Sequence, residues 1–496
     1  MDEDLRSIQE ARHLALAAKA AADTWATASQ ADVDRVVEVV ARAGRAAAPE
    51  LAALAVEVTG YGRADHKEVK DRYVTTQVHE AIAPLRTVGV ISSCPERGVI
   101  EIAEPVGVIA GLIPTTNPVS TVLFKALIAL KARNAIVMAP HPRAVEASLA
   151  AARVVAEALR SAGAPDDLVS CMSQISLSGT NELMHHHRVS LLLATGSLAM
   201  VQAAYSSGKP TYAVGPGNVP AYIHGSADVD DAVDATLAGA TFDYGTPCAS
   251  EQAMIVDRSI ERRARARLEG LGARFLTEAE AERLVSVVIT PQGGIHPEGV
   301  GRSPAALAER AGFDVDPRTT ALVISPGGVG RDHPLSMEIL SPTLKLYSVS
   351  GASEGIERAG ELLRFGGDGH TAGIWAKDER VIAAYAAAAR AFRVIVNTST
   401  CFGAMGGSAG LPASIMLGTG TWGGSITADN IGPLHLINRK RVARGIRDWR
   451  SIPQTAPAHA RADEEVAAAG EAPLVLPDDL VRRVLERLDE PTGGRR

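Results

Sequence analysis

Short apolar runs alternate with helix-patterned segments through most of the chain, and this alternation restricts the possible fold more than any other feature. The first unit has an apolar run at 106–113, a helical stripe of leucine, valine and alanine at 122–130, and a second apolar run at 135–139. Two parallel strands joined by a crossover helix give this pattern. The sequence therefore predicts an α/β protein built on parallel sheets.

The alternation continues along the chain. It recurs with a helix near 145–162 and with apolar runs at 190–195 and 219–223. After Cys248 it resumes with a helix near 260–270 and with the apolar runs Ser286–Thr290, Ala321–Ile324 and Arg393–Asn397. Since a single hydrophobic core stops growing near about 250 to 300 residues, we expect this 496-residue chain to form two α/β domains that meet between Gly217 and Asp243.

The two ends of the sequence differ from this pattern. Residues 1–85 are rich in alanine at helical spacing and predict a helical lead-in. Residues 451–473 combine alanine, proline and charge without periodicity, which is typical of a flexible linker. Residues 474–490 predict an amphipathic helix with an apolar face of leucine and valine. Because so short a helix is marginal by itself, it needs a groove on this chain or on a partner.

Composition and charge exclude several classes of function. The formal net charge is −7, so no overall positive field attracts nucleic acid or an anionic membrane. No apolar run reaches the roughly 18 residues of a membrane span, and the acidic start of the sequence does not resemble a secretory signal. The four cysteines are scattered, without the spacing of a disulfide framework or a zinc site. We expect a reduced, cytoplasmic protein with no metal site.

Three positions stand out as candidates for chemistry, each with an ordinary structural alternative. Thr195, Gly196 and Ser197 end an apolar run and precede a helical segment, where free backbone N–H groups could bind a pyrophosphate. Asn117 precedes Pro118 and could be a helix N-cap or an amide donor to an oxyanion. Cys248 could be a buried small hydrophobe or a nucleophile.

A set of motifs then occurs in the order found in one family. The motifs are Gly111–Pro118, Lys131–Ile136, Pro140–Ala144, Leu193–Gly196, Ala204–Pro210, Thr241–Asp243, Cys248–Gln252, Leu340–Thr343, Trp422–Gly424 and Gly432–Asn438. With these motifs the sequence resembles the CoA-acylating aldehyde dehydrogenases, including the aldehyde dehydrogenase half of bifunctional aldehyde-alcohol dehydrogenases and the acylating sulfoacetaldehyde, acetaldehyde and propionaldehyde enzymes. The resemblance covers roughly residues 1–450.

The resemblance implies an aldehyde dehydrogenase fold with a Rossmann-type cofactor domain, an α/β catalytic domain and a small oligomerisation region. We accordingly expect a cofactor-binding domain at 1–222, with an oligomerisation hairpin at 88–104, and a catalytic domain at 223–402. Residues 403–450 are expected to return to the cofactor domain and to the oligomerisation region. The family also implies a homodimer or homotetramer.

The resemblance further implies that Cys248 is the nucleophile. Its sulfur would attack a small aldehyde, and the oxyanion would be held by the Cys248 N–H and the Asn117 amide. Hydride would pass to NAD or NADP, and coenzyme A would release the resulting thioester. Glu338 matches the carboxylate that holds the nicotinamide ribose, and His370 resembles a histidine of the acylating group that assists proton transfer. The remaining residues assigned to the cofactor site are Pro114, Thr115, Pro140, His141, Thr195, Gly196, Ser197 and Gly215.

One departure from the hydrolytic members is informative. Hydrolytic aldehyde dehydrogenases carry a glutamate that activates water at the position of Val214, which lies 34 residues before Cys248. Around Pro140 and His141 there is also no lysine to bind the adenosine ribose, as is usual in the acylating branch. Without a base for water, thiolysis by coenzyme A should exceed hydrolysis. A hydrolytic enzyme and a catalytically idle structural member of the fold remain the alternatives.

Two expectations concern substrate and location. Because only 4% of the residues are aromatic, we expect a small aldehyde of two to four carbons, without a choice between acetaldehyde, propionaldehyde and sulfoacetaldehyde. Residues 474–490 resemble the encapsulation helices of bacterial microcompartment enzymes. They would place the protein inside such a compartment, bound to a shell protein.

Overall fold

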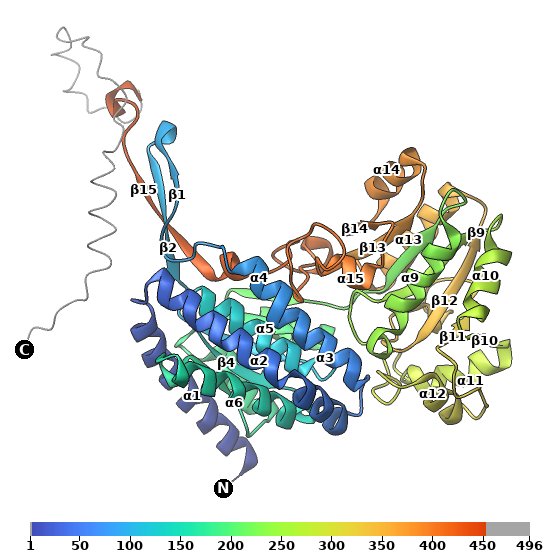
Figure 1. Ribbon diagram of the computed structural model, residues 1–496, viewed down its shortest axis with the longest axis horizontal. Helices are drawn as coiled ribbons and strands as arrows, with labels where there is room; N and C mark the ends of the chain where they lie inside the picture. The colour runs from blue at the N-terminus through green and yellow to red at the C-terminus, as the bar shows by residue number, and fades with distance from the viewer. Residues whose placement is uncertain (1, 453–496) are drawn as a thin grey trace, which may run out of the picture.

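The computed structural model describes residues 2–452 and contains two parallel sheets and a projecting antiparallel ribbon (Figure 1). One lobe holds a five-stranded sheet, and the other holds a seven-stranded sheet. Every neighbouring pair of strands within these two sheets is parallel. The predicted α/β class with parallel sheets is therefore confirmed.

The chain begins with helices, as the alanine spacing predicts. Ser29 starts the second helix by accepting a hydrogen bond from the Asp32 N–H, and Gly60 ends it in a left-handed conformation with φ of 69°. These elements pack against the five-stranded sheet and its helices. They are α1 Glu3–Trp25, α2 Gln30–Thr59, α3 Ala64–Tyr73, the π-helical turn η1 Val74–Val78 and α4 His79–Ile82.

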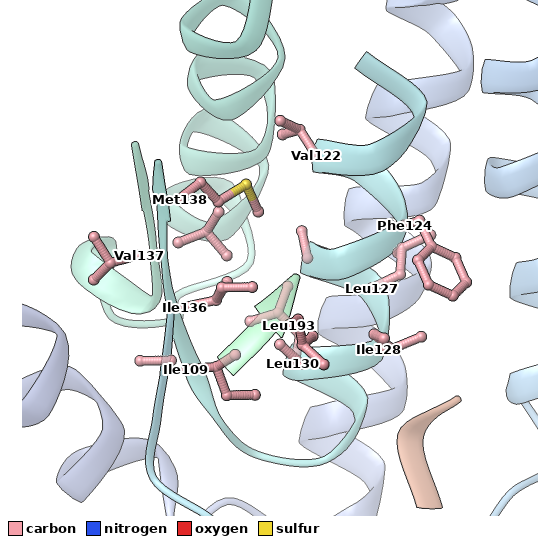
Figure 2. Packing of buried hydrophobic residues seen from close by; sticks show 14 of the residues in the cluster. Ile109, Val122, Phe124, Leu127, Ile128, Leu130, Ile136, Val137, Met138 and Leu193 are labelled. Atoms are coloured by element: carbon pink, nitrogen blue, oxygen red, sulfur yellow. The ribbon is translucent and has the colours of Figure 1, made fainter. Parts of the chain in front are cut away.

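The five-stranded sheet has the strand order β5-β4-β3-β6-β7. Its core is formed where strand residues such as Ile109 and Ile136 pack on Leu127 and Leu130 of the crossover helix (Figure 2). The strands are β3 Val108–Ile113, β4 Ala135–Pro140, β5 Val169–Cys171, β6 Val189–Thr195 and β7 Thr211–Val214. The helices between them are α5 Pro118–Lys131, α6 Val145–Ser161, α7 Leu177–His185 and α8 Leu198–Ser206.

The strand order of this sheet reverses between β3 and β6. These two strands are neighbours, although β4 and β5 lie between them in sequence. The loops that leave their carboxyl ends diverge, and such a switch point leaves a crevice in which ligands bind. The loop after β3 carries Asn117, and the loop after β6 carries Gly196.

The seven-stranded sheet has the order β10-β11-β12-β9-β8-β13-β14. Its strands are β8 Val219–Ile223, β9 Glu251–Asp257, β10 Ala273–Phe275, β11 Ala321–Ile324, β12 Thr343–Val349, β13 Gly369–Trp375 and β14 Ala391–Val396. Its helices are α9 Val229–Thr241, α10 Glu261–Gly270, α11 Glu278–Val288, α12 Pro304–Arg310, α13 Ala352–Gly366, α14 Glu379–Ala388 and α15 Thr400–Ala404.

A short connection fixes how the two sheets face one another. β7 ends at Val214 and β8 begins at Val219, so only residues 215–218 join the carboxyl edge of the first sheet to the amino edge of the second. Because four residues span little distance, these two edges are held close together. The space between them receives the loops that precede β8, β9, β12 and β13.

The third sheet is the ribbon that projects from the first lobe in Figure 1. It has the antiparallel order β1-β2-β15, with strands β1 Gly89–Cys94, β2 Val99–Pro105 and β15 Ile437–Ala443. The hairpin is thus present at 88–104. Its role in oligomerisation stays a prediction.

Two details differ from the sequence prediction, and one prediction falls outside the structure. The apolar run at 286–290 is not a strand, because its first three residues end helix α11 and Ile289 forms only an isolated bridge with Ile295. The predicted boundary at residue 222 falls inside β8, which belongs wholly to the seven-stranded sheet. The proposed helix at 474–490, and all but the first two residues of the linker at 451–473, lie outside the described residues.

Candidate active site

A cavity of about 1060 Å³ lies between the two sheet edges, and nearly all predicted site residues line it. His370 is the exception. The predicted site residues that line the cavity are Pro114, Thr115, Asn117, Pro140, His141, Thr195, Gly196, Ser197, Gly215, Cys248 and Glu338. Residues separated by more than two hundred positions therefore line one cavity, which the motif pattern alone could not establish.

Cys248 lies in the turn between α9 and β9 and is partly exposed to this cavity. Burial, and to a lesser extent the Glu338 carboxylate, raise the pKa of its thiol to about 12, against the lowering effect of Arg393 and of the Cys248 and Ala249 main-chain N–H groups. The thiol is therefore protonated at neutral pH in this arrangement. Its position at the cavity wall fits a nucleophile that must lose a proton before it reacts.

Asn117 occupies the N-cap position of α5, but its side chain makes no capping hydrogen bond. Its Oδ1 atom accepts a hydrogen bond from the ammonium of Lys70, and its Nδ2 atom donates to Thr116 Oγ1 over 3.1 Å. The main-chain oxygen of Asn117 accepts the first bond of the helix, from the Thr121 N–H at 3.1 Å. The side chain is thus available for a role at the cavity.

A buried charge cluster stands behind Asn117 and was not predicted from the sequence. Lys67 and Lys70 of α3 both donate to the Asp243 carboxylate, and Lys67 also donates to the Thr116 carbonyl over 2.8 Å. Burial alone would raise the pKa of Asp243, but Lys70 and Lys67 hold it below its usual value. Asp243 is therefore ionised, and it connects α3 to the segment that leads to Cys248.

Glu338 lies in the loop before β12 and lines the same cavity. Its Oε1 atom accepts the Gly217 N–H over 2.8 Å, and burial raises the pKa of its carboxyl to about 8. The buried Lys345 ammonium lowers that pKa in part, and its own hydrogen bond goes to Gln252 Oε1 at 3.0 Å. Glu338 can accept a hydrogen bond from a hydroxyl group in either protonation state.

The loop after β6 fits the phosphate groups of a dinucleotide. Ser197 is the N-cap of α8 and lines the cavity, so the amino end of this helix, where first-turn N–H groups lack helical partners, lies at the cavity. Thr195 Oγ1 is buried and, among residues 2–452, has no hydrogen-bond partner. The space beside Gly215 is open, and the nearest atoms to a Cβ on Gly196 would be those of Met200 at 3.7 Å. This loop and Glu338 are therefore the residues that could hold NAD or NADP, and this assignment stays a prediction.

His370 is placed near Cys248 but not on the cavity wall. Its ring is fully buried in β13, its Nδ1 atom lies 3.0 Å from Thr371 Oγ1, and burial lowers its pKa to about 3. A Cβ on Gly217 would lie 2.4 Å from the Cys248 carbonyl oxygen and 3.0 Å from the His370 ring. The ring is therefore neutral, and its Nε2 atom has no hydrogen-bond partner among residues 2–452. Its role in proton transfer stays a prediction.

Val214 is the last residue of β7, and its buried side chain lines the same cavity as Cys248. The position that carries a base in hydrolytic enzymes is thus inside the site and apolar. Of the residues the sequence analysis did not single out, Tyr61 and Arg143 also line the cavity, joined by a 2.9 Å hydrogen bond from Arg143 Nη1 to Tyr61 Oη.

Residues 2–452 contain neither a metal site nor a membrane-spanning helix. No cluster of three or more histidine, cysteine, aspartate or glutamate side chains is arranged to hold a metal ion. No helix in this part of the chain has the length and apolar character to cross a bilayer.

Comparison with known proteins identifies the family. The sequence profile of the aldehyde dehydrogenase family matches residues 6–277. This chain belongs to the aldehyde dehydrogenase family. It is 37% identical to the bifunctional aldehyde-alcohol dehydrogenase AdhE of Escherichia coli (strain K12), over 90% of this chain and 51% of that protein. It is 35% identical to an acylating sulfoacetaldehyde dehydrogenase of Cupriavidus necator, over 86% of this chain and 87% of that protein.

Solved structures agree with this assignment. An acetylating aldehyde dehydrogenase of Geobacillus thermoglucosidasius has a TM-score of 0.89 and 47% identity, covering 90% of this chain and 99% of the other. A propionaldehyde dehydrogenase of Rhodopseudomonas palustris, with bound CoA and an acylated cysteine, has a TM-score of 0.77 and 26% identity over 88% and 97% of the two chains. A propionaldehyde dehydrogenase of a Clostridium phytofermentans microcompartment has a TM-score of 0.77 and 26% identity, covering 87% of this chain and 96% of the other.

These findings confirm the resemblance to acylating aldehyde dehydrogenases and the aldehyde dehydrogenase fold. The chain spans about half the length of the aldehyde-alcohol dehydrogenases that it matches. It spans most of the acylating sulfoacetaldehyde dehydrogenase and of the solved structures.

Proposed function

We propose that this aldehyde dehydrogenase family member converts a small aldehyde, CoA and NAD(P)⁺ into an acyl-CoA and NAD(P)H, with Cys248 as the nucleophile. The observation that carries the proposal is that Cys248 and Val214 line one cavity. The site thus offers a thiol that can carry an acyl group, and it has no carboxylate at the position from which hydrolytic members activate water. The acylated cysteine and bound CoA of the Rhodopseudomonas palustris structure support the same chemistry.

The first step joins the Cys248 sulfur to the aldehyde carbon, after the thiol has lost its proton. The carbonyl oxygen becomes an alkoxide, and this negative charge needs donors placed in advance. The Asn117 amide, which lines the cavity, and the Cys248 main-chain N–H are the donors we assign to it. Arg393, whose positive charge favours the thiolate of Cys248, assists the loss of the thiol proton.

The nicotinamide of bound NAD(P)⁺ supplies the hydride acceptor for oxidation. Glu338, which lines the cavity, would orient the nicotinamide end by accepting a hydrogen bond from a ribose hydroxyl. Thr195, Gly196 and Ser197, with the unpartnered Thr195 hydroxyl, are the residues that would hold the cofactor pyrophosphate. Cys248 then carries the acyl group as a thioester.

Release of the acyl group distinguishes the acylating reaction from hydrolysis. Water requires a base to become an effective nucleophile, whereas a thiol has a thiolate accessible near neutral pH. Val214 gives water no base, so the thiol of CoA attacks the thioester and frees Cys248. The presence of Cys248, Asn117 and Glu338 in one cavity argues against a catalytically idle member of the fold.

The deciding experiment measures products with and without CoA. We expect acyl-CoA in amounts equal to the NAD(P)H formed, and no multiple turnover when CoA is omitted. Cys248→Ala should abolish both products. Equal amounts of free carboxylate with and without CoA would instead establish the hydrolytic alternative, and no reduction of NAD(P)⁺ with any small aldehyde would establish the idle one.

For the substrate, we propose an unbranched aliphatic aldehyde of two to four carbons. Phe242, Phe402, Ile415 and Leu417 all line the cavity, which favours an apolar chain. Comparison of kcat/KM for acetaldehyde, propionaldehyde, butyraldehyde and sulfoacetaldehyde tests this choice. Preference for the sulfonate would contradict it.

We also propose a homodimer or homotetramer that forms through the projecting ribbon. Each of its outer strands, β1 and β15, has a pairing partner on one side only within residues 2–452, and such edges are open to pairing with another chain. Removal of residues 89–105 should yield a monomer in light scattering. An unchanged mass would contradict this assignment.

For location, we propose that residues 474–490 bind a microcompartment shell protein. The proposal is supported by the amphipathic pattern of the sequence and by the Clostridium phytofermentans enzyme of similar structure. A fluorescent protein carrying residues 474–490 should gather in punctate shells when shell proteins are produced. Diffuse fluorescence would contradict this assignment.

A further inference from the structure

The side-chain amide of Asn117 can face the cavity in two ways, and only one of them serves an oxyanion. If the NH₂ group faces the reacting oxygen, the amide donates; if it is rotated by half a turn, it presents an acceptor and repels the alkoxide. The orientation therefore decides whether Asn117 contributes to catalysis. The helix it precedes does not fix this orientation, because the side chain makes no capping hydrogen bond.

Lys70 fixes it. Its ammonium donates to Asn117 Oδ1, and an ammonium has no acceptor atom, so the atom of Asn117 that faces it must be the oxygen. The NH₂ group then points away from Lys70. One of its two hydrogens is used by Thr116 Oγ1 at 3.1 Å, which leaves the other free for a ligand.

Lys70 is itself held by Asp243, which lies in the segment before β9 of the seven-stranded sheet. It is buried, lines the cavity and donates a second hydrogen bond to Asp243 Oδ2. The Asp243 carboxylate is kept in place by Lys67 at 3.0 Å, the Thr246 hydroxyl at 2.6 Å and the Arg63 N–H at 2.7 Å.

The segment that carries Asp243 leads directly to the nucleophile. Asp243 and Tyr244 have φ of 50° and 52°, a conformation that non-glycine residues adopt only where the surroundings enforce it. Cys248 follows a few residues later. The two oxyanion donors, on loops from different sheets, are thus connected through one carboxylate and one ammonium.

On the basis of the proposed function, we propose that Lys70 is a positioning residue that orients and polarises the Asn117 amide toward the oxyanion formed at Cys248. The ammonium on Oδ1 draws electron density from the amide, which makes its N–H a stronger donor. Lys70 acts through Asn117, and the Asp243 carboxylate holds it there.

A double-mutant cycle tests this assignment. Asn117→Ala should lower kcat by about 10² to 10³, as loss of an oxyanion donor does, and Lys70→Met should lower kcat about 10 to 100 fold on the same grounds. If Lys70 acts only through Asn117, the double variant should be no slower than Asn117→Ala. The Kd for NAD⁺, from fluorescence quenching, should be unchanged in all three.

Lys125 provides a matched control. It is also a buried lysine, but its ammonium donates to the Leu112 and Leu193 carbonyls, at 2.6 Å and 2.8 Å. If Lys125→Met lowers kcat, its fold-loss should multiply with the fold-loss of Asn117→Ala in the double variant. Because removal of a buried ammonium can prevent folding, the cycle is repeated with Lys70→Gln, which keeps hydrogen-bond donors without the charge. Its loss should be smaller and should also vanish beside Asn117→Ala.

Two outcomes separate the hypotheses. Multiplicative losses in the Lys70 and Asn117 double variant would overturn the positioning role and would mean that Lys70 acts on the reacting oxygen directly or through the fold. If the wild-type protein forms no acyl-CoA, the proposed function itself fails before the cycle is measured.

Discussion

The main-chain N–H of Gly217 donates a hydrogen bond to the Glu338 carboxylate over 2.8 Å. Gly217 belongs to the four-residue connection between the two sheets, and Glu338 belongs to the loop before β12. The bond therefore joins the point where the chain changes sheets to the carboxylate assigned to the nicotinamide end. A Cβ at this glycine would lie only 2.4 Å from the Cys248 carbonyl oxygen, so the same residue also controls the position of the nucleophile.

We predict that Gly217→Ala lowers kcat for acyl-CoA formation by about 100-fold or more, because displacement of a reacting group by about 1 Å has an effect of that size. Gly410→Ala is the control, since no atom lies within 4 Å of a Cβ there and the residue is exposed. Both variants should remain folded by circular dichroism. Full activity of Gly217→Ala would mean that the loop carrying Cys248 moves freely.

Reactivity of the Cys248 thiol should depend strongly on pH. Burial and Glu338 raise its pKa to about 12, and only the thiolate reacts with alkylating agents. Below that pKa the thiolate fraction rises tenfold for each pH unit. Alkylation of Cys248 by iodoacetamide in the free enzyme should therefore increase about 100-fold between pH 7 and pH 9.

Mass spectrometry of the peptide that contains Cys248 measures this rate separately from the other cysteines. Cys248→Ala is the control for assignment of the labelled peptide. A rate that levels off below pH 8 would show that the thiolate is stabilised in the free enzyme, contrary to the environment described above.

Replacement of Val214 by glutamate should open a hydrolytic route. A carboxylate at this buried cavity position has a raised pKa, which suits a base near neutral pH. We predict that Val214→Glu releases free carboxylate without CoA at least about tenfold faster than the wild type, below the 10²- to 10⁴-fold contribution of a well-placed base. The glutamine side chain of Val214→Gln has the same size as glutamate and cannot act as a base, so this variant should release carboxylate no faster than the wild type. Equal rates of carboxylate release in the two variants would contradict the role of position 214 in selecting the acyl acceptor.

Much of the fold and site could be predicted because the relevant signals are local. Apolar runs such as 106–113 are continuous because parallel strands are covered on both faces, and motif residues such as Asn117 and Gly196 follow strands whose carboxyl ends meet at a switch point. The run at 286–290 was misread because a short apolar run does not distinguish a strand from the end of a helix. Thr277 and Glu280 form a capping box three residues apart, and that signal could have revealed α11.

The charge cluster behind Asn117 had no such signal. In the sequence, Lys67 and Lys70 lie in a run of charged residues that is typical of a solvated helix face. In the structure both are buried and pair with Asp243, which lies 176 residues after Lys67 and 173 residues after Lys70. No spacing rule links positions this distant, so the structure was needed to find the group that orients the Asn117 amide.

Glu251, the first residue of β9, should make the protein less stable as pH rises. Its side chain is buried, and burial raises its pKa to about 7 although Oε1 accepts hydrogen bonds from the Ser399 hydroxyl at 2.8 Å and the Thr400 N–H at 2.6 Å. Among the described residues, Oε2 has no partner. A carboxyl whose folded pKa lies above its unfolded value near 4.5 stabilises the fold below pH 4.5, and this contribution is lost as pH rises through 7.

Glu251→Gln keeps the acceptor at Oε1 and removes the titration. Relative to the wild type, its free energy of unfolding should therefore improve between pH 4.5 and pH 8, by on the order of 3 kcal/mol at most. Urea denaturation across this range measures the difference, with Glu57→Gln, at an exposed position on α2, as the control for removal of a carboxyl group from the surface. Parallel curves for Glu251→Gln and the wild type would mean that the Glu251 carboxyl does not take up its proton on folding, and that the Ser399 and Thr400 donors are sufficient to keep it charged.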